Sequence, residues 1–262
     1  MRGHRLMTDL IDETELERKV KGVYQDVAER PGGDFHFEMG RDLAEQLGYS
    51  PSDLDAIPEQ AVESFAGVGY HFDLAALEEG NDVLDLGSGS GTDVFVAAIH
   101  VGESGSVTGL DMTVEQLEKA RTLRDETDIS NVRFEQGKIE NLPFDADTFD
   151  VIVSNGVINL SPAKPRVFEE VSRVLRAGGR FVISDINSES EMPESIKVDP
   201  DLWAACVGGA CPTDYYTRNL EELGFTDVTI RENPEYEFIS EQAKNVCEKY
   251  GIRSVSLLAQ KA

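Results

Sequence analysis

An aspartate followed by alternating glycines is the part of this sequence best suited to chemistry. The motif Asp-x-Gly-x-Gly-x-Gly runs from Asp85 to Gly91 and overlaps the end of a short strand-like run whose apolar residues are Val83, Leu84 and Leu86. Such a run predicts a buried strand, and glycines allow a tight turn at which a ligand approaches backbone amides. A helix expected to begin near Thr92 would point its free N–H groups at the same ligand. The stretch predicts a nucleotide-binding corner, with a purely structural turn as the alternative.

The spacing of the glycines narrows the choice of nucleotide. A dinucleotide fingerprint requires Gly-x-Gly-x-x-Gly, but the sixth position counted from Gly87 is Thr92. Asp111 follows the glycine turn by about 20 residues, the position at which a carboxylate accepts hydrogen bonds from both ribose hydroxyls. A solvated turn carboxylate is the alternative for Asp111. The two features favour a nucleoside ligand over a nicotinamide dinucleotide.

The elements that must position these residues alternate between strands and helices. Strand-like runs cover residues 83–86, 106–110, 132–136, 151–154 and 180–184. This rhythm predicts an α/β fold with a parallel sheet and right-handed crossovers, in which ligands bind at the carboxyl ends of the strands. Between them, Thr113-Val-Glu-Gln116 predicts a capping box that opens a helix over residues 114–125. Ser161-Pro162 predicts the start of a helix that ends at Gly178-Gly179.

The first 75 residues have a different pattern. Leu16, Val20, Val23 and Val27 recur at helical spacing, so residues 1–75 are expected to form a helical extension. Residues 76–190 are expected to form the nucleotide-binding core, and residues 191–262 to complete the sheet and the substrate pocket. His36 is a candidate base, although a packing or surface role fits a lone histidine beside aromatic residues better.

The charge balance excludes some classes of partner. With 24 Lys+Arg against 50 Asp+Glu, the formal net charge is −26, which repels nucleic acid. Dense carboxylates are typical of a protein adapted to a salt-rich cytosol, where the short Debye length weakens their repulsion; an acidic partner-binding face is the alternative. No apolar run reaches the length of a membrane span, and the first ten residues lack a signal-peptide core. We expect a cytoplasmic protein without membrane contact.

The cysteines do not suggest a disulfide framework. The chain has three, Cys206, Cys211 and Cys247, which cannot all pair with one another and include no Cys-x-x-Cys motif. Free thiols are expected, with neither disulfide framework nor metal site.

Further segments make a family resemblance specific. The glycine motif resembles the first motif of class I S-adenosylmethionine-dependent methyltransferases. Residues 109–121, 154–165 and 206–210, in this order, resemble the arsenite methyltransferase family, and the resemblance extends over about residues 20–225. It implies a class I methyltransferase, Rossmann-like doubly wound sheet with an N-terminal helical extension, and S-adenosylmethionine as cofactor. It also implies a pocket closed by the N-terminal region and the segment after the fifth strand.

The sequence departs from the family at two thiols. Val68 and Gly156 stand where family members carry cysteine, and Cys206 alone matches an arsenic-binding position. Trivalent arsenic is soft and prefers several thiolates. Cys211 could bring a second sulfur across the intervening glycine pair, or an external thiol such as glutathione could supply more donors. The alternative is that Cys206 and Cys211 are small buried hydrophobic residues.

The predicted site has three parts. The predicted cofactor-binding residues are Asp85, Gly87, Ser88, Gly89, Gly91, Asp93, Asp111, Met112, Gln116, Ile139, Glu140 and Asn155. The predicted acceptor pocket contains Val68, Gly156, Cys206 and Cys211. Catalytic roles are predicted for Asn155 and Cys206.

The sequence predicts an S-adenosylmethionine-dependent methyltransferase of a small-molecule acceptor. One alternative is methylation of arsenite or another metalloid, using Cys206 with Cys211 or an external thiol. Another is a non-catalytic S-adenosylmethionine-binding protein, and a nicotinamide-dependent oxidoreductase is disfavoured by Thr92. A monomer or a homodimer is expected.

Overall fold

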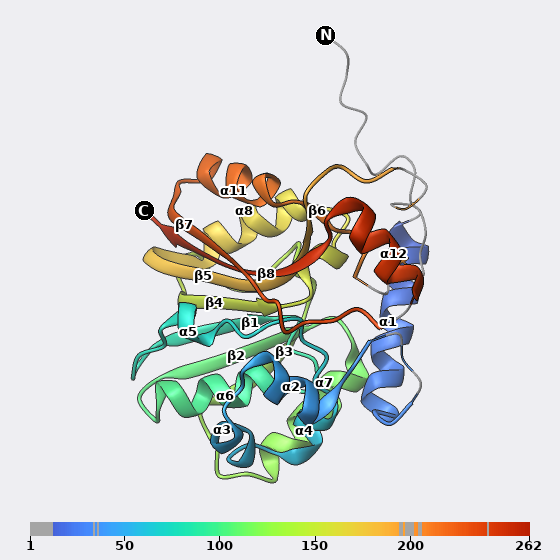
Figure 1. Ribbon diagram of the computed structural model, residues 1–262. Coiled ribbons are helices and arrows are strands. Elements are labelled where there is room, and N and C mark those ends of the chain that lie inside the picture. The colour runs from blue at the N-terminus through green and yellow to red at the C-terminus, as the bar shows by residue number, and fades with distance from the viewer. Residues whose placement is uncertain are drawn as a thin grey trace.

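A central sheet runs through the protein (Figure 1). The chain is described by a computed structural model, in which residues 13–33, 35, 37–193, 196, 202–203, 206–239 and 241–262 are placed; His36 lies outside the described residues. The main path of the sheet has the order β3 (Val132–Gln136), β2 (Ser106–Asp111), β1 (Asp82–Leu86), β4 (Phe149–Asn155), β5 (Leu175–Ser188), β8 (Arg253–Lys261), β7 (Phe225–Glu232). The strands from β3 to β5 are parallel, whereas β8 is antiparallel to both neighbours. The short β6 (Cys211–Pro212) pairs with the end of β5.

Helices cover both faces of this sheet, which is why its central strands are apolar on both sides. On one face lie α6 (Thr92–Val101) and α7 (Val114–Asp125), and on the other α8 (Lys164–Val174) and α11 (Thr213–Glu222) (Figure 1). Successive residues of β1 enter different cores. Val83 packs with the cluster that contains Phe95, and Leu84 with the cluster that contains Phe168. The result is a three-layer, doubly wound fold.

The N-terminal residues form short helices and one long one. The long helix, α1 (Glu13–Glu29), lies at one end of the sheet, near α12 (Glu241–Tyr250) (Figure 1). The short helices are α2 (Gly40–Leu47), α3 (Pro51–Asp55), α4 (Glu59–Glu63) and α5 (Phe72–Ala75). Leu16 and Val20 of α1 are buried in a cluster with Trp203. The apolar stripe predicted for this helix therefore packs against a segment that follows β5.

The five predicted strands are present, and each is as long as predicted or longer. The helix predicted to run from Ser161 to Gly179 is shorter than expected. It ends at Val174, and β5 begins at Leu175, which is already extended and pairs with Phe149. Gly178, with φ +77, lies within β5 where the register with β4 shifts, so the glycines form a bulge in the strand and do not end the helix.

The predicted capping box is also wrong, although helix α7 begins and ends where expected. Thr113 is the N-cap residue but makes no side-chain cap hydrogen bond. Gln116 does not reach back to it, because its amide is bonded elsewhere: it donates to the carbonyl oxygen of Tyr24 and accepts from Ser90. Gln116, which the sequence pattern places in a local cap, instead makes tertiary contacts.

Two classes of feature are absent among the placed residues. None of the helices there is both long and apolar enough to cross a membrane. Within the same ranges, no three His, Cys, Asp or Glu side chains cluster in a way that could hold a metal ion. The three cysteines are free.

His71, next to α5, gives the fold a predicted acid sensitivity. Its ring is fully buried, neither ring nitrogen has a hydrogen-bond partner in the placed part of the chain, and burial lowers its pKa. The unfolded chain binds this proton more readily, so the folded state loses stability as pH falls below about 6.5. Asp85, Asp111 and Asp185, whose pKa values burial raises, act in the opposite direction.

We therefore predict that His71→Phe removes the contribution of this histidine to the pH dependence of the free energy of unfolding. The stability difference between variant and wild type should grow in favour of the variant by up to about 1.4 kcal/mol per pH unit below 6.5, and stay constant above pH 7.5. Urea unfolding at a series of pH values measures it. A difference independent of pH between 5 and 8 would show that His71 is not the group that titrates.

Candidate active site

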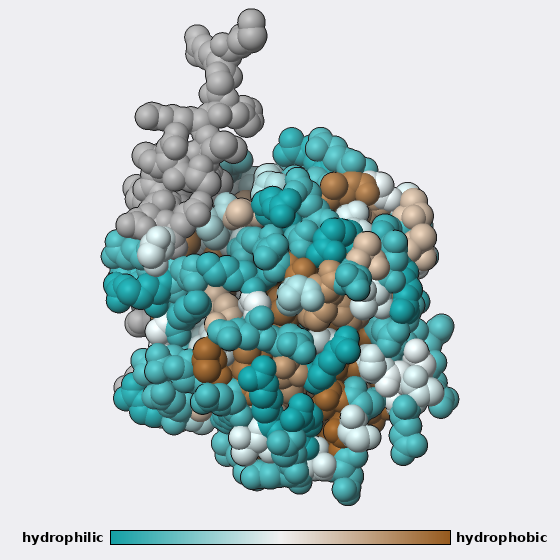
Figure 2. Space-filling model, turned by 180° about the vertical axis from the view of Figure 1, so that it is seen from behind, coloured by the Kyte–Doolittle hydropathy of each residue, from teal (hydrophilic) through white to brown (hydrophobic). Residues whose placement is uncertain are grey.

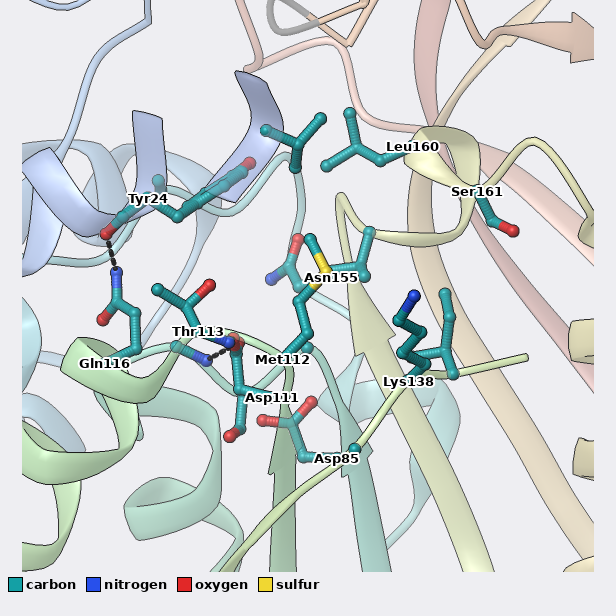
Figure 3. Close-up of a pocket in the computed structure, with 18 of the residues that line it drawn as sticks. Tyr24, Asp85, Asp111, Met112, Thr113, Gln116, Lys138, Asn155, Leu160 and Ser161 are labelled. Carbon is teal, nitrogen blue, oxygen red and sulfur yellow. Dashed lines mark hydrogen bonds between the residues drawn. The ribbon is translucent and has the colours of Figure 1, made fainter. Parts of the chain in front are cut away.

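A cavity of about 340 Å³ opens at the carboxyl ends of β1, β2 and β4. All of the predicted cofactor residues line it except Gly91, and none of the four predicted acceptor residues does. Figure 3 shows side chains from α1, α7, the strand ends and the turn after β4 around this space. The cavity size and the mixture of apolar walls with a few polar groups are typical of a small-molecule site.

The glycine loop forms one wall through its backbone. Gly87 and Gly91 have φ of +75 and +97, in the left-handed region that favours glycine. A β-carbon on Gly87 would lie 2.4 Å from a methyl group of Val157, and one on Gly91 would lie 2.9 Å from the ring of Phe134. At Gly89 the nearest atom would be 3.8 Å away, on Gln116. Gly87 and Gly91 therefore shape the turn, while Gly89 leaves its backbone open to a ligand.

Asp111 ends β2 with its carboxylate beside this loop. Its two oxygens accept backbone N–H bonds from Gly89 at 2.9 Å and Thr113 at 2.8 Å. Burial raises its pKa, and these hydrogen bonds partly offset that effect. A carboxylate has about four acceptor positions, so it can accept hydrogen bonds from a ligand in addition to those from the backbone. The arrangement suits a vicinal diol such as a ribose.

The cavity carries a concentration of negative charge. Asp85 is 2% exposed, and its pKa is raised well above the usual range by burial first and then by the charges of Asp93 and Asp111. Removing carboxylates from water is costly unless a positive group lies nearby. This donor set therefore fits a ligand that carries positive charge next to its ribose.

The side-chain amide of Asn155, at the end of β4, is hydrogen-bonded through both its oxygen and its nitrogen. Its amide oxygen accepts the N–H of Val68 at 2.8 Å, and its amide nitrogen donates to the carbonyl of Gly69 at 3.0 Å. The same nitrogen contacts Tyr49 Oη at 3.1 Å and Asp93 Oδ2 at 3.2 Å. Tyr49 in turn donates to Asp93 at 2.5 Å. With its amide so engaged, Asn155 positions the 67–69 segment against the sheet.

We predict that Asn155→Leu destabilises the protein by about 1–3 kcal/mol, because it leaves the buried N–H of Val68 without an acceptor. Chemical denaturation measures the change. Asn131→Leu is the matched control for loss of an asparagine, because it removes an amide that lies away from the cavity and is bonded to the carbonyl oxygens of Ala98 in α6 and of Gly102 just after it. We expect the cofactor affinity to fall in Asn155→Leu alone; an unchanged affinity there would separate Asn155 from the site.

Three of the four predicted acceptor residues lie together. The Cys206 sulfur is 3.8 Å from the carbonyl oxygen of Gly156, and a β-carbon on Gly156 would lie 3.3 Å from Val68. Val68 and Cys206 belong to the same buried cluster. Burial raises the pKa of the Cys206 thiol to about 12, the charge of Asp185 adds to this, and a hydrogen bond with Tyr24 opposes it. The thiol is therefore protonated at neutral pH.

Cys211 lies apart from this group. Its sulfur contacts the carbonyl oxygen of Gly209 at 3.6 Å. It lines a separate cavity of about 50 Å³ together with Lys164 and Tyr215. The Cys206 sulfur faces Gly156, so the structure does not bring the two sulfurs to one pocket.

Helix α1 supplies one wall of the cavity; the resemblance implied a pocket closed by the N-terminal region, but no residue of this helix was among the predicted site residues. Leu16, Glu17, Val20 and Tyr24 all line the cavity. Glu17 forms an ion pair with Lys138 at 2.6 Å, across the opening, and Lys138 favours the charged form of Glu17 and lowers its pKa. The helical spacing predicted a buried face for this helix, but nothing in the spacing indicates what that face covers.

The fold and the site together define a class of protein. A doubly wound sheet with this glycine corner, an acid at the end of β2 and a negatively charged cavity is that of the class I S-adenosylmethionine-dependent methyltransferases. A methyltransferase-domain family model matches residues 77–246. The chain belongs to this methyltransferase family.

Individual relatives agree with this assignment. The chain is 42% identical to an arsenite methyltransferase of Halobacterium salinarum over 211 residues, which cover 80% of this chain and 54% of the relative. It is 40% identical to the arsenite methyltransferase of Mus musculus, over 59% of this chain and 46% of the relative. The crystal structure of an arsenic(III) S-adenosylmethionine methyltransferase from Chlamydomonas reinhardtii matches with a TM-score of 0.63 and 33% identity, over 85% of this chain and 74% of the other. The chain spans about half the length of the curated relatives it matches.

Proposed function

We propose that this protein transfers a methyl group from S-adenosylmethionine to a small, soft acceptor, and that thiol-bound trivalent arsenic is the first candidate. The observation that carries the proposal is the pairing of two features at the strand ends. A negatively charged cavity with a diol-binding carboxylate lies next to a buried group in which Val68, Gly156 and Cys206 meet. The arsenite methyltransferase relatives support this choice of acceptor.

The residues of the cavity account for cofactor binding. S-adenosylmethionine supplies a methyl group on a positively charged sulfur. Asp111 accepts the ribose hydroxyls, the open backbone at Gly89 approaches the ligand, and Ile139 and Glu140 border the adenine. A bound sulfonium and ammonium favour the charged form of Asp85, which burial disfavours, and Asp93 adds a second carboxyl group beside it. Methyl transfer depends mainly on alignment and on exclusion of water, which α1 provides by covering the cavity.

On the side of the methyl acceptor, this chain supplies one thiol, that of Cys206. When a trivalent arsenic hydroxide binds, an As–O bond breaks, an As–S bond to Cys206 forms, and the thiol proton leaves with the hydroxide as water. A protonated thiol is sufficient for this exchange, so the high pKa of Cys206 does not prevent it. Arsenic keeps its lone pair, so no general base is needed for the transfer. With Cys211 facing another cavity, we propose that external small thiols occupy the remaining arsenic positions.

The acidic surface supports a salt-rich cytoplasm as the setting. The formal net charge is −26, and hydrophilic residues dominate the face shown in Figure 2. Among the placed residues, the exposed large hydrophobic side chains are scattered along the chain: Ile99, Val114 and Ile239. We propose that the protein works in high salt as a monomer or homodimer, without nucleic acid as a partner.

The proposal is tested with purified protein in high salt, methyl-labelled S-adenosylmethionine and separate acceptors: arsenite with glutathione, glutathione alone, and sarcosine as an amine. We expect labelled methylarsenic only in the first reaction. Label in sarcosine alone would replace the proposed acceptor class with amines. Tight cofactor binding with no labelled product in any reaction would favour a non-catalytic cofactor-binding protein.

A further inference from the structure

Gln116 joins the glycine loop to helix α1. Its side chain is 1% exposed, and both ends of its amide are bonded. The amide oxygen accepts from the Ser90 hydroxyl at 2.5 Å. The amide nitrogen donates to the carbonyl oxygen of Tyr24 at 2.8 Å, the bond drawn between these two residues in Figure 3. Ser90 is part of the glycine loop, and Tyr24 lies 92 positions away in sequence, on α1. A single side chain therefore spans the two walls of the cavity.

The loop end of this connection depends on the same contacts that shape the cofactor site. Ser90 is buried next to Gly89, whose N–H is bonded to Asp111. A ligand that binds Asp111 and the loop backbone restricts this loop, and it thereby fixes the hydroxyl that Gln116 accepts from. The position of the Gln116 amide follows, since two hydrogen bonds at opposite ends determine its rotamer.

The other end of the connection determines the wall beside Cys206. Tyr24 lines the cavity, and its side chain lies near enough to the Cys206 thiol to lower the pKa of that thiol. On the preceding turns of α1, Leu16 and Val20 pack on Trp203, whose carbonyl accepts the N–H of Cys206 at 2.9 Å. Placement of α1 therefore decides whether the space next to Cys206 is closed to water.

A second α7 residue holds α1 without touching the glycine loop. Lys119, nearly one turn after Gln116, bonds to Ser64 at 2.6 Å and approaches the carbonyl oxygen of Ala28 at 3.5 Å. The helix thus has two polar attachments to α7, of which one includes the loop and the other does not. This difference provides a matched control within the chain.

We infer that Gln116 is a positioning residue through which an occupied glycine loop fixes α1 over the cavity, so that the cofactor binds first and completes the acceptor site beside Cys206. The inference rests on the proposed function, because it requires a cofactor at the glycine loop. It goes further in assigning an order of binding and in giving Gln116 a role distinct from cofactor contact. Coupling between two sites is a difference in free energy, and it acts equally in both directions.

Hydrogen exchange with and without S-adenosylmethionine tests the coupling, in parallel with calorimetry of cofactor binding. In wild type we expect the cofactor to slow exchange at residues 20–28 by about tenfold, within the usual range of allosteric coupling. In Gln116→Met, which removes both hydrogen bonds at similar size, exchange is measured at a cofactor concentration that calorimetry shows to be saturating, and the same amides should slow less than about threefold. Ser90→Ala removes only the hydrogen bond between the glycine loop and Gln116, and it should reduce the slowing of exchange to the same extent.

The Lys119 variant distinguishes coupling of α1 to the bound cofactor from simple attachment of α1 to α7. Lys119→Met should speed exchange of α1 in the free protein yet retain the tenfold slowing on cofactor addition. Equal slowing in wild type, Gln116→Met and Ser90→Ala would overturn the inference, because direct contact between α1 and the cofactor would then be sufficient. Wild-type protein that binds no cofactor by calorimetry would overturn the proposed function along with it.

Discussion

Replacing Asp111 with alanine should weaken S-adenosylmethionine binding by about 2–4 kcal/mol, or roughly 30- to 1000-fold in Kd. Two effects combine. The variant loses the carboxylate positions that remain for the ribose hydroxyls, and the N–H groups of Gly89 and Thr113 lose their acceptor, which loosens the loop. Calorimetry at fixed high salt measures the change.

Two control variants isolate the chemistry of Asp111. Asp128→Ala removes one negative charge from an exposed position outside the cavity, so it should leave the affinity unchanged. Asp111→Asn keeps one acceptor oxygen at nearly the same size and should give an intermediate loss. If Asp111→Ala binds as tightly as wild type, Asp111 is not a cofactor ligand and the assignment of the cavity is wrong.

Introducing a second thiol next to Cys206 should change how the protein binds arsenic. Val68→Cys replaces a side chain that lies 3.3 Å from where a β-carbon on Gly156 would stand and that shares a buried cluster with Cys206. Because two thiols held together act at high effective concentration, we expect arsenite binding without added thiol to tighten by about 10- to 100-fold. The need for glutathione during turnover should fall accordingly.

The background for this experiment is Cys211→Ser, which removes the thiol that faces the other cavity and should not alter arsenite binding. Val68→Ala controls for the loss of volume at position 68. Adding Cys206→Ser to Val68→Cys should return binding to the background level. A gain that persists in the absence of Cys206 would show that position 68 acts with some other group.

The strands and the cofactor acid could be predicted because they depend on local patterns. Val83, Leu84 and Leu86 put apolar side chains on both faces of β1 because helices cover both sides of the sheet. A parallel sheet also brings the end of β2, at Asp111, to the same edge as the glycine loop. The order β5, β8, β7 was not predictable in this way. It depends on the antiparallel pairing of residues such as Asp185 and Val255, which are far apart in sequence.

The contacts that join α1 to Gln116 could not be predicted from residue spacing for a similar reason. Gln116 stands where a capping box requires a glutamine, and the spacing cannot reveal that its amide is bonded to a carbonyl 92 residues away. Likewise, Cys206 and Cys211 are close in sequence across two glycines, but the left-handed backbone at Cys206 (φ +60) and the pairing of Cys211 with β5 direct their sulfurs to different places. The two cysteines are close along the chain but their sulfurs lie apart, whereas Gln116 and Tyr24 are far apart along the chain but are hydrogen-bonded.

The measurement that most directly tests the account is single-turnover transfer of labelled methyl from S-adenosylmethionine to arsenite with excess glutathione. Wild type and Cys211→Ser should form labelled methylarsenic and S-adenosylhomocysteine in equal amounts, while Cys206→Ser should form neither above background. A Cys206→Ser variant that binds the cofactor and methylates arsenic as fast as wild type would contradict the central claim that Cys206 holds the acceptor.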